Sequence, residues 1–292
     1  MEGLAPIDGW AVAAILAKAV GYGAALLAIG GPIFIAIFRE APDDVLHIAR
    51  KIAVVAALIG LAVLALRFGI RSARISGMGM AGMTDPIMLG IVWDSPLGGS
   101  ALWRGAGAAL VLTVIFNRGV TLALGVVGAV LMATSYTLIG HSLAEPRWLL
   151  AGLLSIHLMA VGFWVAALAP LYRATFHVQG ATLLHRFGGV ASVIVAALIL
   201  VGLVFAWLMT GSLTGLVTTA YGWTLLGKLS VVTGLLCLAA LNKWRLVPAL
   251  AAGQVSAGRH LRTSIRWESA AIAVTLIVTA TLTSVTTPPI NM

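Results

Sequence analysis

The chain has 292 residues, of which 61% are hydrophobic and only 9% are charged, whereas about a quarter of the residues in a soluble domain are charged. This composition excludes a soluble globular domain and predicts an all-α integral membrane protein. The single cysteine, Cys237, excludes a disulfide framework. The net charge of +9 falls in short segments between apolar stretches, where the orientation bias of membrane proteins explains it without nucleic acid.

Eight stretches of the chain have the length of about 20 mostly apolar residues that a transmembrane helix needs. All eight are predicted to be helices, because lipid offers no other partner to backbone polar groups in an open chain. The third and fourth stretches meet at "FNRGV" and therefore predict a very tight hairpin. We expect one polytopic domain over residues 1–292, with spans at 10–38, 46–70, 98–117, 119–140, 148–172, 185–210, 222–247 and 264–286.

Basic residues are unevenly distributed between these spans. They concentrate in three segments, 38–51, 171–186 and 242–266, whereas the segments "HSLAEPR", "TGSLTGLVTTAYG" and "TTPPINM" that alternate with them hold a single Arg. Cytoplasmic loops carry the excess of Lys and Arg, so the first three segments are predicted to be cytoplasmic and both termini periplasmic. The outer segment 67–97 departs from this rule, because it contains Arg67, Arg71 and Arg74.

Two histidines lie on the outward-facing part of the predicted bundle. His141 falls at the outer end of the fourth span, and His157 lies near the middle of the fifth, within the apolar run "SIHLMAVGFW". An ionisable residue at that depth is a functional candidate by default, and a neutral imidazole is the commonest metal ligand. The alternative is that His157 only forms a hydrogen bond with a neighbouring helix.

The outer segment "ISGMGMAGMTDPIM" supplies a second group of soft ligands, with Met78, Met80 and Met83 close in sequence. Thioether sulfur suits Cu(I) and needs no deprotonation. Methionine in an amphipathic segment is also often an adaptable hydrophobic residue. With two histidines on the same side, the sequence favours copper, as Cu(I), as the bound metal.

Other ionisable residues at depth are Lys18, Arg104 and Lys228, each expected to pair with a carbonyl oxygen or to reach the interface with its long side chain. Acidic residues are missing from the middle of the spans, so a proton relay based on Asp or Glu is not expected. The chain has no phosphate-binding Walker motif, which argues against ATP-driven transport by this chain alone.

Three stretches of the sequence resemble the copper resistance protein D (CopD) family. "GHS" at 140–142 resembles a Gly-His at the outer end of the fourth span, and "IHLMAVGFWVAAL" at 156–168 resembles the histidine-bearing helix. "YGWTLLGKLSVVTGLLCLAALNKWRLVPAL" at 221–250 resembles the Tyr-Gly, Leu-Lys-Leu and Asn-Arg-x-Arg-Leu-x-Pro signature of the family. The sequence departs from the family pattern at Ala166 and Ala167, where paired glycines are usual, and at "RFG" (186–188), where Arg-Phe-Ser is usual.

The resemblance implies copper uptake across the bacterial inner membrane, together with a small periplasmic, CopC-like copper-binding protein. Carried over to this sequence, His141, His157 and Trp164 match family positions, whereas the methionines do not. We therefore expect a carrier or channel without catalytic chemistry of its own, which accepts copper from the periplasm and imports it. Two alternatives stay open: a membrane haem protein or oxidoreductase that uses the pair His141 and His157, and a copper sensor that binds without transport.

Overall fold

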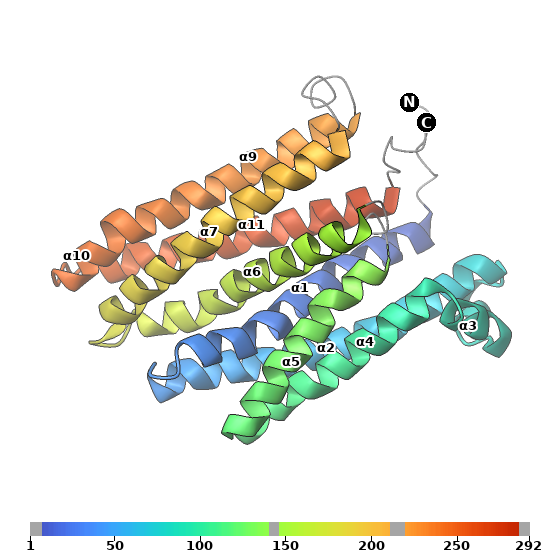
Figure 1. Cartoon of the computed structure of the whole chain (residues 1–292), viewed down its shortest axis with the longest axis horizontal. Coiled ribbons are helices and arrows are strands. Elements are labelled where there is room, and N and C mark those ends of the chain that lie inside the picture. Colours follow the sequence, from blue (N-terminus) through green and yellow to red (C-terminus); the bar gives the residue numbers. More distant parts are fainter. Residues whose placement is uncertain (1–7, 140–145, 211–219, 286–292) are drawn as a thin grey trace. The chain divides into compact units, whose positions relative to one another are not determined.

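The computed structural model describes residues 8–139, 146–210 and 220–285, and gives only the backbone for 205–210, 220–225, 228, 282 and 285. Within these residues every regular element is a helix (Figure 1), which confirms the predicted all-α class. The long helices are α1 (Gly9–Ile37), α2 (Asp43–Ser76), α4 (Pro96–Leu112), α5 (Gly119–Ser135), α6 (Arg147–Ala174), α7 (Gly180–Thr210), α9 (Ala220–Leu241) and α11 (Ala257–Val285). The shorter helices are η1 (Gly79–Met83), α3 (Pro86–Trp93), η2 (Thr113–Phe116), η3 (Tyr136–Leu138), the π-helix η5 (Asn242–Leu246) and α10 (Val247–Ala251).

Seven helices in the described part of the chain are long and apolar enough to cross a membrane. They match the first seven predicted spans, and lie at Gly9–Ile37, Asp43–Ser76, Pro96–Phe116, Gly119–Leu138, Arg147–Ala174, Gly180–Val204 and Leu229–Ala251. The eighth predicted span, 264–286, overlaps α11, which is a regular helix but is not among these seven. A total of eight spans therefore stays a prediction.

The backbone contacts divide the chain into two compact units. Unit 1 comprises Met1–Glu40, Leu46–Ala167 and Leu276–Val285, and unit 2 comprises Ala41–Val45, Leu168–Thr275 and Thr286–Met292. The histidine and methionines singled out in the sequence that the structure describes, His157, Met78, Met80 and Met83, all belong to unit 1.

Several helices begin at residues that satisfy the free N–H groups of a first turn. Asp8 accepts a hydrogen bond from the backbone N–H of Ala11, and Asp85 accepts one from Met88 at the start of α3. Ser95 accepts one from Leu97 at the start of α4. Prolines follow directly at positions 86 and 96, where the missing N–H of proline costs no helical hydrogen bond.

The hairpin between α4 and α5 is as tight as "FNRGV" predicts. Asn117 is the single residue between η2 and Arg118, and it has a left-handed conformation with a φ of 50°. Its side-chain oxygen accepts a hydrogen bond from Arg50 of α2. Further along the hairpin, a Cβ atom at Gly107 would lie 2.7 Å from the carbonyl oxygen of Gly128, so glycine permits the two backbones to meet.

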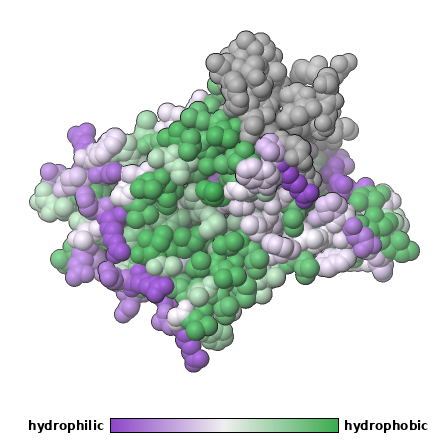
Figure 2. All heavy atoms as spheres, in the orientation of Figure 1, coloured by the Kyte–Doolittle hydropathy of each residue, from purple (hydrophilic) through white to green (hydrophobic). Residues whose placement is uncertain are grey.

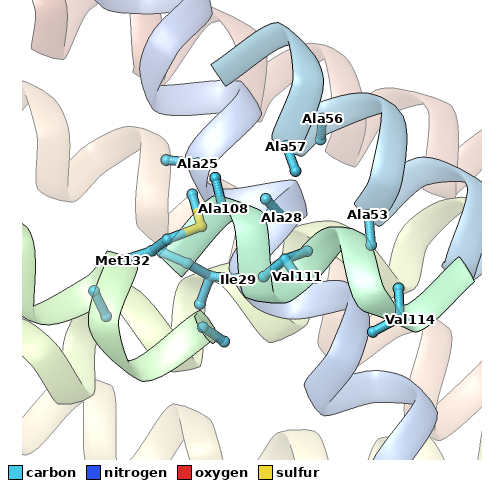
Figure 3. Packing of buried hydrophobic residues seen from close by; sticks show 12 residues of the cluster. Ala25, Ala28, Ile29, Ala53, Ala56, Ala57, Ala108, Val111, Val114 and Met132 are labelled. Atoms are coloured by element: carbon cyan, nitrogen blue, oxygen red, sulfur yellow. The ribbon is translucent and has the colours of Figure 1, made fainter. Parts of the chain in front are cut away.

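The core of unit 1 is built from small apolar side chains of α1, α2, α4 and α5 (Figure 3). Alanines dominate it, and small residues let neighbouring helices approach closely where hydrophobic exclusion from water cannot drive packing. Ile29 and Met132 fill the remaining space. The buried residues of this cluster are Ala25, Ala28, Ile29, Ala53, Ala56, Ala57, Ala108, Val111, Val114, Ala129, Met132 and Ala133.

Helix α1 makes a close backbone contact with α6, the helix that carries His157. A Cβ atom at Gly30 would lie 1.8 Å from the carbonyl oxygen of Gly162 and 2.7 Å from Cβ of Ala166. The fully buried rings of Phe34 and Phe163 lie beside this contact, with centroids 6.5 Å apart. The glycines that permit close approach are thus Gly30 and Gly162, whereas Ala166 fits beside them with its methyl group.

Replacing Gly30 by valine is expected to destabilise unit 1 by about 3 kcal/mol, because the added atoms overlap a backbone carbonyl that cannot rotate away. Thermal or detergent unfolding of the purified protein measures the loss. Gly152→Val on α6 is the matched control, since a Cβ atom there meets nothing within 4 Å. Equal stability of the two variants would contradict the packing of α1 on α6.

Large apolar side chains cover the outward sides of the helices, as a lipid-facing surface requires. Figure 2 shows apolar residues over much of the visible face, with hydrophilic residues gathered towards its edge. Two exposed tryptophans, Trp93 and Trp148, lie at helix ends, where their amphipathic rings suit the membrane–water interface.

The predicted orientation is tested by the accessibility of single cysteines. Cys237 is exposed, so it is first replaced by alanine, and cysteine is then introduced at Ser142 or at the exposed Ser256. An impermeant thiol reagent added from the periplasmic side is expected to label position 142 and not position 256, because the basic segment 242–266 is predicted to be cytoplasmic. Labelling of position 256 from the periplasm would overturn the orientation.

Candidate functional site

His157 lies deep in an apolar helix. It is the eleventh residue of α6, which begins at Arg147, so about 15 Å of helix separates it from that end at 1.5 Å per residue. The apolar core of a membrane is about 30 Å thick, and α6 is one of the candidate spans. The imidazole is therefore expected near the middle of the membrane, and its side chain is half-buried in the protein.

The helix that carries His157 is packed against its neighbours in the turn and a half that follows the imidazole. Leu158 and Met159 pack against the apolar core of unit 1. Gly162 meets α1 one turn further on, and Phe163 stacks on Phe38 with ring centroids 6.3 Å apart. This packing fixes the direction in which the Cα–Cβ bond of His157 points, as a binding residue requires.

No described residue forms a hydrogen bond with His157. The sequence suggests Thr134, Ser135 or Thr137 of the preceding span as partners that would fix its tautomer. Their hydroxyl groups instead donate to carbonyl oxygens of their own segment: Thr134 to Val130, Ser135 to Met132 and Thr137 to Thr134. Within the described chain the two ring nitrogens of His157 are thus left without a protein partner.

The methionine segment is anchored to the end of α2. The Ser72 hydroxyl donates a hydrogen bond to the carbonyl of Gly82, and Ser76 accepts one from the backbone N–H of Met78 at 3.2 Å. Gly77 and Gly79 have φ values of 67° and 62°, which glycine adopts without strain. The turn therefore presents η1 at a fixed place beside α2.

The three methionines have different surroundings. Met78 and Met80 are 50% and 73% exposed. Met83 packs against α2, where a Cβ atom at Gly69 would lie 3.1 Å from its terminal methyl group. The side chains of Met78 and Met80 are thus accessible from outside the protein, whereas Met83 contributes to the attachment of the segment.

His141 lies outside the described residues, so its distance from His157 is not part of this structure, and neither the copper pair nor the haem pair is tested. The described residues contain no group of three or more His, Cys, Asp or Glu side chains placed to hold a metal ion. His47, His185 and His260 are exposed. His177 is the exception among the remaining histidines, because its Nε2 lies 2.9 Å from the Asp44 carboxylate.

Lys18 and Arg104 have the partners that an ionisable group in a membrane helix needs. Lys18 donates to the carbonyl oxygen of Thr283 at 2.8 Å, which confirms the predicted pairing with a carbonyl. Arg104 is buried and donates to the hydroxyl groups of Ser135 and Ser100 at 3.1 and 3.0 Å. The side chain of Lys228 lies outside the described residues.

The surroundings of two further ionisable residues in the helices are not predicted by the sequence. Arg67 falls where the predicted span 46–70 and the outer segment 67–97 overlap; α2 continues to Ser76, so Arg67 lies within the helix and lines a cavity with Arg104. Glu268 is only 3% exposed and accepts a hydrogen bond from the Nδ2 of Asn242. The signal for the longer helix is the absence of proline from "ALRFGIRSAR" at 65–74, because proline is the residue that ends a helix most strongly.

An all-helical chain with seven candidate spans and apolar outward faces is a multi-pass membrane protein. Two family models match it: "Copper resistance protein D-like, N-terminal domain" over residues 7–151 and "Copper resistance protein D" over residues 181–282. Together they cover most of the chain, which therefore belongs to the copper resistance protein D family. Comparison with curated proteins and with solved structures gave no match.

Proposed function

We propose that this protein accepts copper at the periplasmic face of the bacterial inner membrane and carries it inward. It acts as a carrier or channel rather than an enzyme. Family membership supports a role in copper resistance or homeostasis, and the path and direction are our inference from the residues. Copper is the substrate, favoured as Cu(I).

The observation that carries the proposal is the unpartnered imidazole of His157. Burial of a polar group without a hydrogen bond is costly, and within the described chain no protein group compensates it. The apolar surroundings favour the neutral imidazole, which is the form that binds a metal ion. A copper ion that arrives from the outer side would supply the missing interaction.

The exposed methionines provide the entry step. Met78 and Met80 lie on a segment fixed to α2, and thioether sulfur binds Cu(I) without loss of a proton. Weak, soft ligands at the surface suit capture, since the ion must leave them again to move inward. A small periplasmic, CopC-like copper-binding protein would deliver copper to this segment.

The alternative haem protein would use His141 and His157 as axial ligands. One of these residues is expected at the interface and the other about 15 Å along its helix, as the rise of 1.5 Å per residue requires. A bis-histidine haem needs both nitrogens on opposite sides of one macrocycle. Membership of a copper resistance family favours copper over haem.

Uptake by proteoliposomes tests the proposal directly. Vesicles containing the full chain and an internal copper chelator are supplied with Cu(I) under anaerobic conditions. We expect uptake that saturates with copper concentration, because a transport path with discrete ligands has a finite number of sites. Uptake no faster than in protein-free vesicles would contradict transport.

Replacing Met78 and Met80 together by leucine is expected to slow uptake several-fold at limiting copper and to have little effect at high copper, because capture limits the rate only when copper is scarce. Adding Met83→Leu is expected to change uptake no further, since leucine preserves the packing of Met83 on Gly69. Initial uptake rates over a range of copper concentrations measure both effects. An equal loss at every concentration would show that the methionines do not act in capture.

A further inference from the structure

Three positively charged side chains converge in unit 1, from three helices. Lys18 belongs to α1, Arg67 to α2 and Arg104 to α4. They are close enough for their charges to act on one another, Lys18 with Arg67 and Arg67 with Arg104. Like charges repel strongly where the dielectric constant is low, so this arrangement needs a compensating negative charge.

No described residue provides that negative charge. Asp44 forms ion pairs with Arg173 and His177, but it belongs to unit 2. Lys18 donates to a neutral carbonyl and a hydroxyl, and Arg104 donates to two neutral hydroxyls. Arginine does not lose its proton in proteins, so deprotonation offers no escape for Arg67 or Arg104.

Arg67 and Arg104 line the same cavity, which has a volume of about 10 Å³. Tyr136 also lines it, and its ring lies 3.9 Å from the Cζ of Arg104. Gly21 and Gly60 contribute walls without side chains, which leaves the space open. A cavity of this size holds about one water molecule or an ion of similar size.

The hydrogen-bond donors around this cavity exceed the acceptors. Ser135 and Ser100 use their own hydrogens on backbone carbonyls, of Met132 and of Ser135, and offer only lone pairs to Arg104. The Nη1 group of Arg104 and the whole guanidinium of Arg67 form no hydrogen bond with a described residue. N–H groups are therefore available to a ligand that accepts several hydrogen bonds.

We propose that the cavity between Arg67 and Arg104 binds a small monovalent anion of the halide class. A halide accepts several N–H donors at once and has a size near that of water. It also neutralises part of the charge, which a water molecule cannot do. A larger oxyanion such as sulfate does not fit a space of about 10 Å³. This anion site is separate in its residues from the proposed copper path and does not depend on it.

Thermal unfolding of the purified full chain in lipid nanodiscs tests the proposal. The midpoint is measured in increasing sodium chloride, with sodium gluconate keeping the ionic strength constant. A ligand that binds the folded state raises the midpoint in a saturable manner, so we expect saturation by chloride and bromide and none by sulfate. The absence of a saturable chloride effect, or an equal effect of sulfate, would overturn the site.

Substitutions locate the response. Arg67→Gln and Arg104→Gln are each expected to weaken the apparent affinity for chloride at least about tenfold, because each removes a charge-assisted hydrogen bond. Arg74→Gln, on the same helix but exposed, is the control and is expected to retain the wild-type affinity. If Arg104→Gln does not fold, Arg67→Gln decides alone. Unchanged chloride affinity in Arg67→Gln would place the anion elsewhere and refute the proposal.

Discussion

Replacing His157 by alanine is expected to abolish saturable copper uptake while the protein still inserts, purifies and unfolds at a similar temperature. The imidazole has no hydrogen-bond partner among the described residues, so its removal breaks no described hydrogen bond. The helix remains held by Gly162 and Phe163. Uptake by proteoliposomes and the unfolding midpoint are measured on the same preparation.

A structural role for His157 would give the opposite combination. A lost interhelical hydrogen bond in a membrane costs about 1 kcal/mol, which would lower the unfolding midpoint and leave transport largely intact. His185→Ala is the matched control, because His185 is exposed on α7 and should affect neither property. A folded His157→Ala protein that takes up copper at the wild-type rate would show that the imidazole is not a ligand.

Replacing Glu268 by alanine is expected to destabilise unit 2 by about 2–3 kcal/mol, since the buried amide of Asn242 loses a charged acceptor. Asn242 already has an unpaired buried Oδ1 atom, so the amide would then lack partners on both sides. Asn242 begins the π-helix η5, a rare type of helical turn. Denaturant or thermal unfolding of the purified protein measures the difference.

Glu268→Gln separates the two contributions to this effect. Glutamine keeps an oxygen for the Nδ2 of Asn242 and removes only the charge. Glu268→Gln should therefore lose clearly less stability than Glu268→Ala. Ser269→Ala, next to Glu268 on α11, removes a hydroxyl that only donates to the carbonyl of Ile265, and serves as the control. Equal stability of Glu268→Ala and the wild type would contradict the buried pair.

The helices of this fold could be predicted well from hydropathy alone. Lipid leaves the backbone no other way to satisfy its polar groups, so a long apolar stretch fixes both the type and the approximate length of an element. The turn at Asn117 was also predictable, because only one or two residues separate two complete spans. The resemblance carried by "LNKWRLVP" at 241–248 falls within the range matched by the copper resistance protein D model, whereas "HLMAVGFW" at 157–164 lies between the two matched ranges.

The extent of α2 could not be predicted in the same way. Hydropathy falls after residue 70, where Arg71 and Arg74 appear, but the helix continues to Ser76. Helical hydrogen bonds persist outside the apolar core, because the backbone needs only local partners there. Arg67 thus falls at the boundary of the predicted span 46–70, and the sequence does not predict its convergence with Arg104. Such contacts depend on the rotation of one helix against another, which a single sequence does not encode locally.

The candidate site was predictable as a list of residues but not as an arrangement. His157 was found from its depth alone, and the structure adds the absence of a described hydrogen-bond partner. Met78, Met80 and Met83 read as one group in the sequence, whereas packing on Gly69 sets Met83 apart. The difference arises because Met83 follows the buried Gly82 on a segment fixed by Ser72.

Anaerobic titration of the purified full chain with Cu(I) is the measurement closest to the central claim, that His157 binds copper within the membrane. The absorption spectrum is recorded first, and Cu(I) is then added in competition with a chelator of known affinity. We expect no haem absorption, tight binding of Cu(I) by the wild type, and loss of the tight step in His157→Ala. A haem band in the purified protein, or identical Cu(I) binding by the wild type and His157→Ala, would contradict the account.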